Sequence, residues 1–371
     1  MTDIIAAVVD APGAPFDVRA ITLGDPGPGE VRVRIAGVGI CHTDLVAQAG
    51  WFTAPMPAVF GHEGSGIVES VGQGVTKVAP GDRVALSFLS CGSCACCSRG
   101  EPAYCADMTP LNSSGSRPDG TTPLKDGDRD VAGAFFGQSS FASHSIASER
   151  NVVKVPEGVP LDIAGILGCG VQTGAGAVLR SLDCAPGSSL VVFGIGAVGL
   201  AAVMGAKLRG LSTVIAVEIH ESRRALALEL GATHAIDPTA EDAAEAIRAI
   251  LPGGVDAVLD TTGLPQVVDT VPAILAKRGQ FGFVGIPPAA QIDLKLPGTL
   301  MGAMRNGWTF RGIIEGDSDV DGFLAELMDE YLAGRFPFDR MVARYPLSKI
   351  NEAVADQHAG RYLKPVLIPG E

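Results

Sequence analysis

The chain has 371 residues, of which 47% are hydrophobic and 19% charged, and its formal net charge is −13 at pH 7. This length suits two domains, each able to bury a core. The excess of acidic residues argues against nucleic acid or an anionic membrane surface as a partner. The uncharged segment 184–206 is interrupted by five glycines and by Pro186, so we expect no membrane span there.

The N-terminal residues MTDIIAAVVD contain Asp3 and Asp10 and lack a basic region. No signal peptide is therefore predicted, and we expect a cytoplasmic protein. The chain has eight cysteines. In a long chain without a secretion signal, such a number indicates metal or thiol chemistry rather than disulfides.

The first forty residues predict short β-strands. Residues 31–40, VRVRIAGVGI, follow the turn-rich segment GDPGPGE and lead into Cys41-His42-Thr43-Asp44. His62 comes 21 residues after Cys41, in the run Gly61 to Gly64 (GHEG), and Cys169 follows much later. Two thiolates and one imidazole can form a zinc site with an open fourth position for water or substrate. Taken singly, each cysteine could be a small buried apolar residue and the histidine could be structural.

A second cysteine cluster lies between these positions. Its four members are spaced C-x2-C-x2-C-x7-C: Cys91, Cys94, Cys97 and Cys105. Four thiolates without a histidine or an open position predict a closed, structural zinc site. A disulfide knot, a redox pair or an iron–sulfur cluster are the alternatives. Cys96 adds an extra thiol, which is either free and oxidisable or a competing ligand in a shifted register.

The polar, glycine-rich residues 106–134 predict a surface loop. Beyond it, the strand-like SLVVF is followed at once by a glycine turn of the form G-x-G-x-x-G, made by Gly194, Gly196 and Gly199. In a dinucleotide site these glycines permit a tight turn, approach of the backbone to a pyrophosphate, and close helix–strand packing. Glu218 ends the next apolar run, 24 residues after Gly194. A carboxylate there accepts hydrogen bonds from ribose hydroxyls and repels a 2′-phosphate, so NAD is predicted rather than NADP.

From residue 225 onward, helix-like segments such as RALALELGA alternate with apolar runs such as VDAVLD and GQFGFVGIPP. This rhythm predicts a parallel sheet with crossover helices. We expect a first domain over 1–170 with a metal lobe at about 88–108, a second over 171–314, and a return to the first over 315–371.

The chain resembles zinc-dependent medium-chain alcohol dehydrogenases over nearly its whole length. The resemblance rests on the GHEGSG run, the set of Cys41, His62 and Cys169, the four-cysteine lobe and the glycine turn. ICHTDLVAQAGWF (40–52) and FFGQSSFASHSIAS (135–148) resemble the aryl-alcohol (benzyl alcohol) dehydrogenase branch. The resemblance implies an α/β protein: a GroES-like, β-rich catalytic domain plus a Rossmann cofactor domain with a doubly wound parallel sheet. It also implies NAD and two Zn²⁺ per subunit, one catalytic and one structural.

Residue by residue, the resemblance makes Cys41, His62 and Cys169 the ligands of the catalytic zinc. Glu63 would approach the metal during water exchange, Asp44 would orient His62, and Thr43 would accept the proton of the substrate. The implied cofactor contacts are His42 at the pyrophosphate, Thr173 and Val198 near the nicotinamide, Glu218 and Arg223 at the adenosine ribose, and Lys364 at a phosphate. Ile286 is a further expected cofactor contact. Thr43 could instead cap backbone, and Arg223 could be a solvated helix residue.

One position departs from the family pattern. Many members have a histidine three residues after the threonine, which passes the proton to solvent, but this chain has Val46 there. The proton must then leave by another route, and we expect its release to be slower or more dependent on pH.

The predicted substrate pocket is apolar and comprises Trp51, Phe88, Phe135, Phe136 and Ile286. It favours hydrophobic primary alcohols, whether aryl, allylic or terpenoid, oxidised to aldehydes by direct hydride transfer to NAD⁺. The first alternative is a glutathione- or mycothiol-dependent formaldehyde dehydrogenase, for which only Arg117 and Arg129 offer candidate cations. The second is a metal- or dinucleotide-sensing binding protein, which would leave the set around Cys41 unexplained.

A homodimer is expected, with a tetramer as the alternative, because the long form of the loop 106–134 resembles that of dimeric family members. The strand-like GWTFRGII (307–314) could pair across a two-fold axis. The only other expected partner is the small-molecule alcohol or aldehyde.

Overall fold

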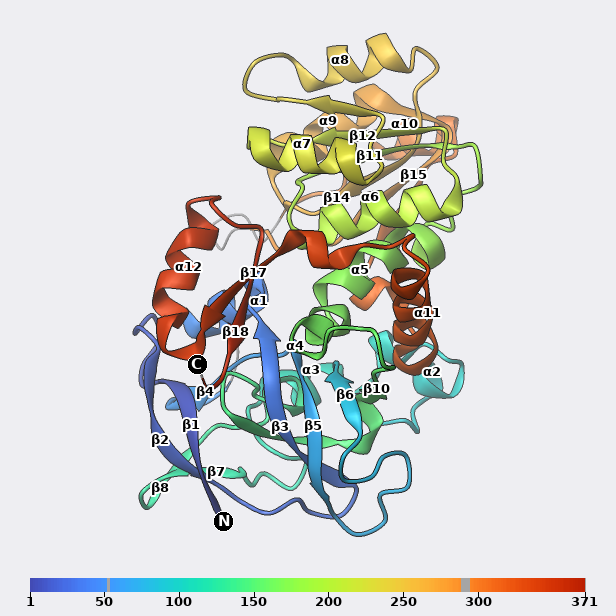
Figure 1. Cartoon of the computed structure of the whole chain (residues 1–371). Coiled ribbons are helices and arrows are strands. Elements are labelled where there is room, and N and C mark those ends of the chain that lie inside the picture. Colours follow the sequence, from blue (N-terminus) through green and yellow to red (C-terminus); the bar gives the residue numbers. More distant parts are fainter. Residues whose placement is uncertain (52–53, 288–293, 371) are drawn as a thin grey trace. The chain divides into compact units, whose positions relative to one another are not determined.

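The chain builds one unit, leaves it to build a second, and returns to the first. The first unit comprises residues 1–170 and 319–371, and the second comprises Val171–Ser318. The computed structural model describes residues 1–51, 54–287 and 294–370. Phe52 and Pro288, the last residues of two segments used in the sequence interpretation, lie outside the described residues. Both chain ends belong to the first unit (Figure 1).

The first unit is built on two β-sheets. The first sheet has the strand order β4 (Ala58–Val59), β1 (Thr2–Val9), β2 (Asp17–Leu23), β7 (Leu124–Asp126) and β8 (Arg129–Val131). The second has the order β10 (Val152–Lys154), β6 (Arg83–Leu86), β5 (Gly64–Val71), β3 (Glu30–Gly39), β18 (Lys364–Ile368) and β17 (Val342–Pro346), with β9 (His144–Ser148) also paired to β3. The C-terminal strand β18 thus pairs with β3, directly before Cys41.

Helices lie between these strands along the chain. They are α1 (His42–Gln48), α2 (Ala95–Ser98), α3 (Met108–Ser113), α4 (Leu161–Ala164), α11 (Val320–Leu332) and α12 (Ile350–His358). The alternation of buried and exposed residues along β3 explains its amphipathic sequence, since Val31, Val33 and Ile35 point into the core.

The second unit contains a six-stranded parallel sheet. Its order is β13 (His234–Ile236), β12 (Thr213–Val217), β11 (Ser189–Phe193), β14 (Val255–Asp260), β15 (Leu275–Phe283) and β16 (Thr309–Gly312). The helices are α5 (Gly170–Gly176), which begins at the last residue of the first unit, α6 (Ala197–Arg209), α7 (Glu221–Leu230), α8 (Ala243–Ile250), α9 (Pro265–Ile274) and α10 (Leu300–Asn306).

The chain adds β12 and β13 on one side of β11, and then returns to add β14, β15 and β16 on the other side. This is the doubly wound arrangement predicted from the alternating pattern (Figure 1). A continuous apolar core lies between the sheet and the helices α8 and α9. It includes Val191, Phe193 and Ile215 from the strands with Ile247 and Val271 from the helices. The predicted fold class is confirmed.

One predicted boundary and one predicted loop differ from the structure. The return to the first unit comes at Asp319 rather than at residue 315. Residues 315–318 stay with the second unit because the Glu315 carboxylate accepts a hydrogen bond from Gln172 Nε2 at 2.9 Å. The segment 106–134 is not one surface loop, because it contains α3 and the hairpin β7–β8, which extends the first sheet through β2.

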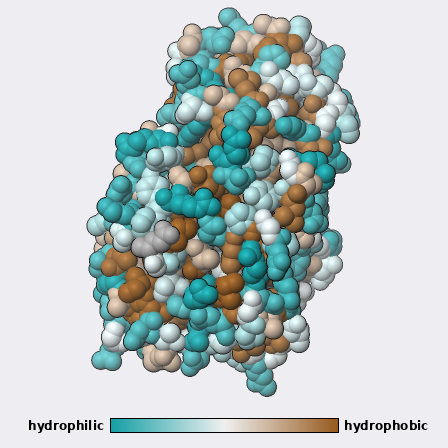
Figure 2. Space-filling model, in the orientation of Figure 1, coloured by the Kyte–Doolittle hydropathy of each residue, from teal (hydrophilic) through white to brown (hydrophobic). Residues whose placement is uncertain are grey.

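On the face shown in Figure 2, hydrophobic residues are interspersed with hydrophilic ones. One helix of the second unit exposes several large apolar side chains in a row. In α10, Leu300, Met301 and Met304 are 89%, 57% and 68% exposed. Such a group is larger than the isolated apolar residues found on most protein surfaces and marks a candidate contact surface.

Candidate active site

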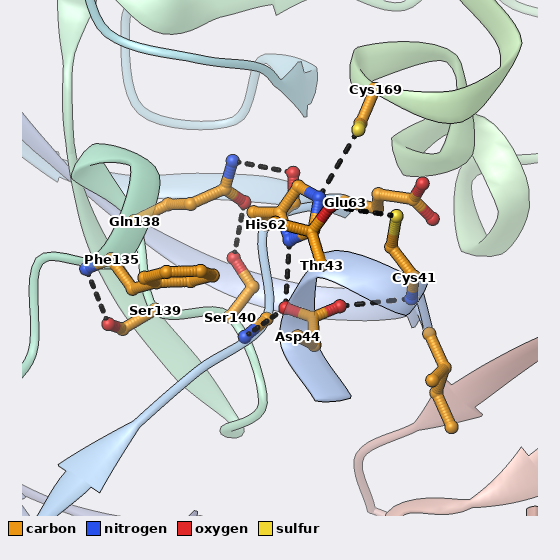
Figure 3. Close-up of polar contacts among 12 residues, drawn as sticks. Cys41, Thr43, Asp44, His62, Glu63, Phe135, Gln138, Ser139, Ser140 and Cys169 are labelled. Atoms are coloured by element: carbon orange, nitrogen blue, oxygen red, sulfur yellow. Dashed lines mark hydrogen bonds and ion pairs between the residues drawn. The ribbon is translucent and has the colours of Figure 1, made fainter. Parts of the chain in front are cut away.

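Four side chains that could bind a metal converge on one point, from three segments of the first unit. The ligand atoms of Cys41, His62, Glu63 and Cys169 all lie within 4.8 Å of one another. Cys41 ends the connection from β3 to α1, His62 and Glu63 precede β5, and Cys169 follows the turn 165–168. His62 Nε2 lies 3.2 Å from Cys169 Sγ, and Figure 3 shows both sulfur atoms near the imidazole.

Asp44 fixes the orientation of this imidazole. Its Oδ1 contacts His62 Nδ1 at 2.8 Å and accepts from Gly61 N–H at 3.0 Å, and its Oδ2 accepts from Cys41 N–H at 2.9 Å (Figure 3). Because a carboxylate accepts, Nδ1 carries the proton and Nε2 is left to face the two sulfur atoms. One side chain therefore holds the backbone of one ligand and the ring of another.

Electrostatics within the cluster favour the thiolate form of Cys41. Hydrogen bonding with Cys169, together with the charge of His62, holds the pKa of the Cys41 thiol well below its usual range although burial opposes this. Burial alone would lower the pKa of His62, but the neighbouring Asp44 and Cys41 charges raise it. Two thiolates and an imidazole suit tetrahedral zinc and leave one position open, so these residues fit a catalytic zinc ion.

Lys364 is buried beside the candidate metal site rather than exposed to solvent. Its side chain is 2% exposed, forms an ion pair with Glu63 Oε2 and donates to Ile40 O at 3.1 Å. Burial raises the pKa of Glu63 to about 7 against the opposing charge of Lys364. Since its ammonium is buried and already paired, the predicted phosphate contact of Lys364 is not supported. A Cβ at Gly39 would lie 2.1 Å from Glu63 Oε2, so glycine makes room for this pair.

Two of the predicted pocket residues contact His62, the histidine of the candidate metal site. The ring of Phe136 stacks on His62 with centroids 4.5 Å apart and planes at 28°, and Phe135 meets the imidazole edge-to-face at 5.7 Å. Phe88 is buried and Trp51 is 42% exposed. Phe136 has a backbone φ of 52°, an uncommon conformation for an aromatic residue, and such strain is found most often at functional sites.

The residues that follow Cys41 form the first turns of α1. Thr43 is half-buried and its Oγ1 lies 3.7 Å from Cys41 Sγ, whereas His42 is exposed and Val46 is half-buried. The threonine hydroxyl is therefore beside the sulfur of a candidate metal ligand, where it can take part in proton transfer.

The four-cysteine lobe forms a second cluster of candidate metal ligands. The ligand atoms of Cys91, Cys94, Cys97 and Cys105 lie within 4.8 Å of one another. Backbone N–H groups of Cys97 and Ala106 lower the pKa of Cys94 to about 6, whereas burial raises that of Cys105 to about 12. The four sulfur donors fit a structural zinc ion. All eight cysteines lie in the described part of the chain and no disulfide joins them.

Cys96 does not join this group of four, although it neighbours Cys97 in the sequence. Its Sγ instead accepts a hydrogen bond from the Arg99 guanidinium at 3.4 Å.

In the second unit, the glycine turn has the shape that a dinucleotide site requires. Gly194 adopts a φ of +84°, and a Cβ there would lie 2.6 Å from Thr261 Oγ1. A Cβ at Gly199 would lie 1.9 Å from Gly194 O, so only glycine lets α6 pack against the turn. Gly196, by contrast, faces open space, with no atom within 4 Å of its Cβ position among the described residues. α6 begins at Ala197, directly after this open position, and the first N–H groups of a helix have no partner within it, which suits a pyrophosphate.

Glu218 is buried beside this turn. Its Oε2 accepts from Ile195 N–H at 2.8 Å and its Oε1 accepts from His220 N–H at 3.0 Å. The nearest guanidinium nitrogen of Arg223 lies 3.9 Å from Glu218 Oε2. The neighbouring Arg224 donates to Glu218 O and pairs with Asp237 instead.

The remaining predicted cofactor residues also lie in the second unit. Thr173 is buried, with its Oγ1 3.5 Å from Glu315 Oε2. Val198 is in the first turn of α6, and Ile286 follows β15 and is 39% exposed.

Comparisons with known proteins agree with this geometry. The family description "Alcohol dehydrogenase GroES-like domain" matches residues 27–157, and "Zinc-binding dehydrogenase" matches residues 197–330. The chain is 48% identical over 365 residues to the geraniol dehydrogenase of Castellaniella defragrans, covering 98% of this chain and 97% of that protein. The solved benzyl alcohol dehydrogenase of Acinetobacter calcoaceticus has a TM-score of 0.95 and 41% identity, with 100% of both chains covered.

The chain belongs to the zinc-binding medium-chain alcohol dehydrogenase family.

A more distant relative shows the breadth of this family. The S-(hydroxymethyl)glutathione dehydrogenase of Saccharomyces cerevisiae is 36% identical over 374 residues, covering 98% of this chain and 95% of that protein. Membership makes the chain a zinc-binding alcohol dehydrogenase and an oxidoreductase, which favours an enzyme over a sensing protein.

The alcohol dehydrogenase fold also positions polar residues that the sequence interpretation did not single out. Gln138, Ser87 and Ser140 are buried in the first unit, and Figure 3 shows Gln138 and Ser140 close to His62. Gln138 and Ser140 belong to the segment FFGQSSF, where three polar residues stand between phenylalanines. Polar residues inside an apolar run were the available signal, because burial requires such groups to be hydrogen-bonded.

Within the described residues, no single helix is long and apolar enough to cross a membrane, although the bent pair Leu161–Gly168 and Gly170–Ser181 together reaches that length and composition. A cytoplasmic location remains a prediction.

Proposed function

We propose that this alcohol dehydrogenase uses NAD⁺ to oxidise hydrophobic primary alcohols reversibly to aldehydes, with one catalytic and one structural zinc ion per chain. The observation that carries the proposal is the convergence of Cys41, His62 and Cys169, with Asp44 orienting the imidazole. Four sulfur donors in the separate lobe support the second zinc ion.

The residues of the chain have distinct tasks in this reaction. When bound, zinc supplies a Lewis acid that lowers the pKa of an alcohol, and NAD⁺ supplies the hydride acceptor. Asp44 and His62 hold the donor set in a fixed orientation. Thr43 Oγ1, beside Cys41 Sγ, accepts the alcohol proton and passes its own onward. Val46 carries no titratable group, so the proton continues to water.

The substrate class is inferred from the apolar groups around His62. Phe136 and Phe135 cover the imidazole and offer no hydrogen-bonding group to a substrate. The two relatives named for geraniol and benzyl alcohol support the same class of hydrophobic alcohol. We therefore propose an aryl, allylic or terpenoid alcohol.

A panel of substrates tests the proposal directly. NAD⁺ reduction would be followed with benzyl alcohol, geraniol, ethanol and formaldehyde plus glutathione, on protein whose zinc content has been measured. We expect two zinc ions per chain and higher kcat/KM for the first two alcohols than for ethanol. Two zinc ions with turnover of none of these alcohols would contradict the proposed reaction.

The thiol-dependent formaldehyde reaction is the second candidate, because the yeast relative carries that name. One geometric feature weakens it. Arg117, a candidate cation for a thiol carboxylate, donates from both Nε and Nη2 to Glu30, each at 2.8 Å, and is therefore already neutralised. Formaldehyde oxidation that depends on added glutathione would favour this candidate.

Changing Glu218 to glutamine should weaken the preference for NAD⁺. Glutamine keeps an acceptor oxygen for Ile195 N–H, but it loses the second acceptor, used by His220 N–H, and the negative charge that repels a 2′-phosphate. Since a charge-assisted hydrogen bond contributes roughly 1.5–3 kcal/mol, we expect the ratio of kcat/KM for NAD⁺ over NADP⁺ to fall by about tenfold or more. The control is Glu221→Gln, an exposed carboxylate at the start of α7. An unchanged cofactor ratio in the Glu218 variant would contradict this assignment.

We further propose a homodimer formed through the second unit. β16 is the last strand in the order of the sheet, and the apolar residues of α10 precede it in the chain. An exposed edge strand beside apolar surface is suited to pairing with a second copy. Light scattering should give twice the chain mass, and Met304→Glu should shift it toward one chain, whereas Leu332→Glu on α11 should not. A monomeric mass for the unmodified protein at micromolar concentration would contradict the dimer.

A further inference from the structure

A buried amide side chain lies directly behind the metal-ligand segments. Gln138 follows the turn Phe135–Gly137 and is 1% exposed. Its Nε2 donates to His62 O at 2.9 Å and to Ser87 O at 3.1 Å. Its Oε1 accepts from Gly64 N–H at 3.1 Å and from Ser140 Oγ at 2.7 Å. The amide thus uses both of its N–H donors and both acceptor positions of its oxygen. If the amide were rotated by 180°, its oxygen would face two carbonyl oxygens, so the contacts assign the positions of Nε2 and Oε1.

These contacts hold both ends of the segment 62–64, which carries His62. His62 O and Gly64 N–H lie on either side of Glu63, so one side chain holds the backbone of residues 62–64 from both ends. Figure 3 shows the Gln138 amide beside the backbone of His62, on the opposite side from Cys41. The position of the imidazole therefore depends on Asp44 through the ring and on Gln138 through the backbone.

Ser87 extends this connection to the second ligand segment. Its carbonyl accepts from Gln138, and its hydroxyl donates to Gly168 O at 2.6 Å, directly before Cys169. A Cβ at Gly168 would lie 1.9 Å from Leu86 O, which shows how closely the two backbones approach. His62 and Cys169 are 107 residues apart in sequence but are joined through Gln138 and Ser87.

The loop that carries Gln138 is held in an uncommon conformation. Phe136 and Ser139, on either side of it, have positive φ values of 52° and 53°. Ser139 Oγ accepts from Phe135 N–H at 2.9 Å and donates to Val59 O at 2.7 Å, which stabilises the bend. Strained backbone persists where surrounding contacts over-determine it, and here it presents the amide to His62 O and the Phe136 ring to the imidazole.

We propose that Gln138 is a positioning residue of the catalytic metal centre, which sets the spacing of His62 Nε2 and Cys169 Sγ through His62 O, Gly64 N–H and Ser87. The proposal rests on the proposed function, because it concerns the site to which that function assigns the catalytic zinc. Partners that orient metal ligands without touching the metal change metal affinity when they are lost.

The test compares metal binding in two variants with the unmodified protein. Gln138→Met keeps the length of the side chain and removes its polar atoms. Ser87→Ala removes only the hydroxyl contact with Gly168 and is the milder change, so it decides the question if Gln138→Met does not fold. We expect zinc to be lost to a chelator roughly tenfold faster from the catalytic site of Gln138→Met. With cobalt(II) in that site, we expect a shifted d–d absorption spectrum in both variants.

Asn351→Leu is the matched control. Asn351 clamps the backbone of Phe16 in the same two-sided way, accepting from its N–H at 3.1 Å and donating to its carbonyl at 2.8 Å. This variant should keep the cobalt spectrum and zinc loss of the unmodified protein. The proposal would be overturned if Gln138→Met and Ser87→Ala kept the cobalt(II) spectrum and the rate of zinc loss of the unmodified protein. The proposed function would then remain intact. An unmodified protein that binds no metal at Cys41, His62 and Cys169 would overturn both.

Discussion

Replacing Cys169 by serine should give a folded protein that contains one zinc ion per chain instead of two and has lost at least about a thousandfold in kcat/KM for alcohol. Serine has nearly the same shape, but its hydroxyl is not a zinc ligand at neutral pH. Lewis-acid activation contributes several kcal/mol to the transition state, and each 1.36 kcal/mol corresponds to tenfold in rate. Elemental analysis and steady-state kinetics on the same sample measure both effects.

Cys184→Ser is the matched control for this experiment. Cys184 is also buried, and burial raises the pKa of its thiol to about 11, but it belongs to neither group of metal ligands. It should keep two zinc ions and full activity. Retention of most alcohol oxidation by Cys169→Ser would remove Cys169 from the catalytic site, whatever the zinc content.

Replacing Cys97 by serine should mainly lower the thermal stability of the protein rather than act directly on catalysis. The lobe around Cys97 has only the four-residue helix α2 and a three-residue turn, Pro102–Tyr104, so little apolar core holds it without metal. Loss of a structural metal is among the few changes that cost more than about 4 kcal/mol. At roughly 2–4 °C per kcal/mol, we expect the Tm to fall by about 10 °C, measured by differential scanning calorimetry.

The neighbouring thiol provides the control for the lobe. Cys96→Ser lies in the same short helix but outside the group of four, so it should keep both zinc ions and the Tm of the unmodified protein. If Cys96→Ser lost the structural zinc and Cys97→Ser kept it, the register of the predicted ligands would be wrong.

Regular elements and the glycine turn were predictable because their signals are local. SLVVF forms β11, α6 begins directly after Gly196, and Gly210 ends that helix in the left-handed conformation. A fully buried strand reads as a continuous apolar run, and the turn needs glycine where a Cβ would strike neighbouring atoms. These requirements are met within about twenty residues, so the alternation of strands and helices was visible in the sequence.

The hairpin β7–β8 shows where a local reading failed. Gly127-Asp128 connects the two strands and is a recognised two-residue hairpin signal, but the surrounding polar residues suggested a loop. Leu124 pairs with Leu23 in β2, about one hundred residues away in the sequence. Pairing with a distant strand, rather than local hydrophobicity, makes this segment part of the sheet.

The candidate zinc ligands were identifiable from residue type and spacing, because zinc in proteins is bound mainly by thiolate, imidazole and carboxylate groups, and the spacing separated an open set from a closed one. Three contacts became known from the packed fold: Lys364 pairs with Glu63, Asp44 holds the backbone of Cys41 in addition to the His62 ring expected from the resemblance, and Gln138 lies behind the ligands. Lys364 contacts Ile40 across 324 residues of chain. A buried polar group takes whichever partner the packed fold brings within hydrogen-bond distance, and that choice depends on how distant segments pack together, which local sequence patterns do not specify.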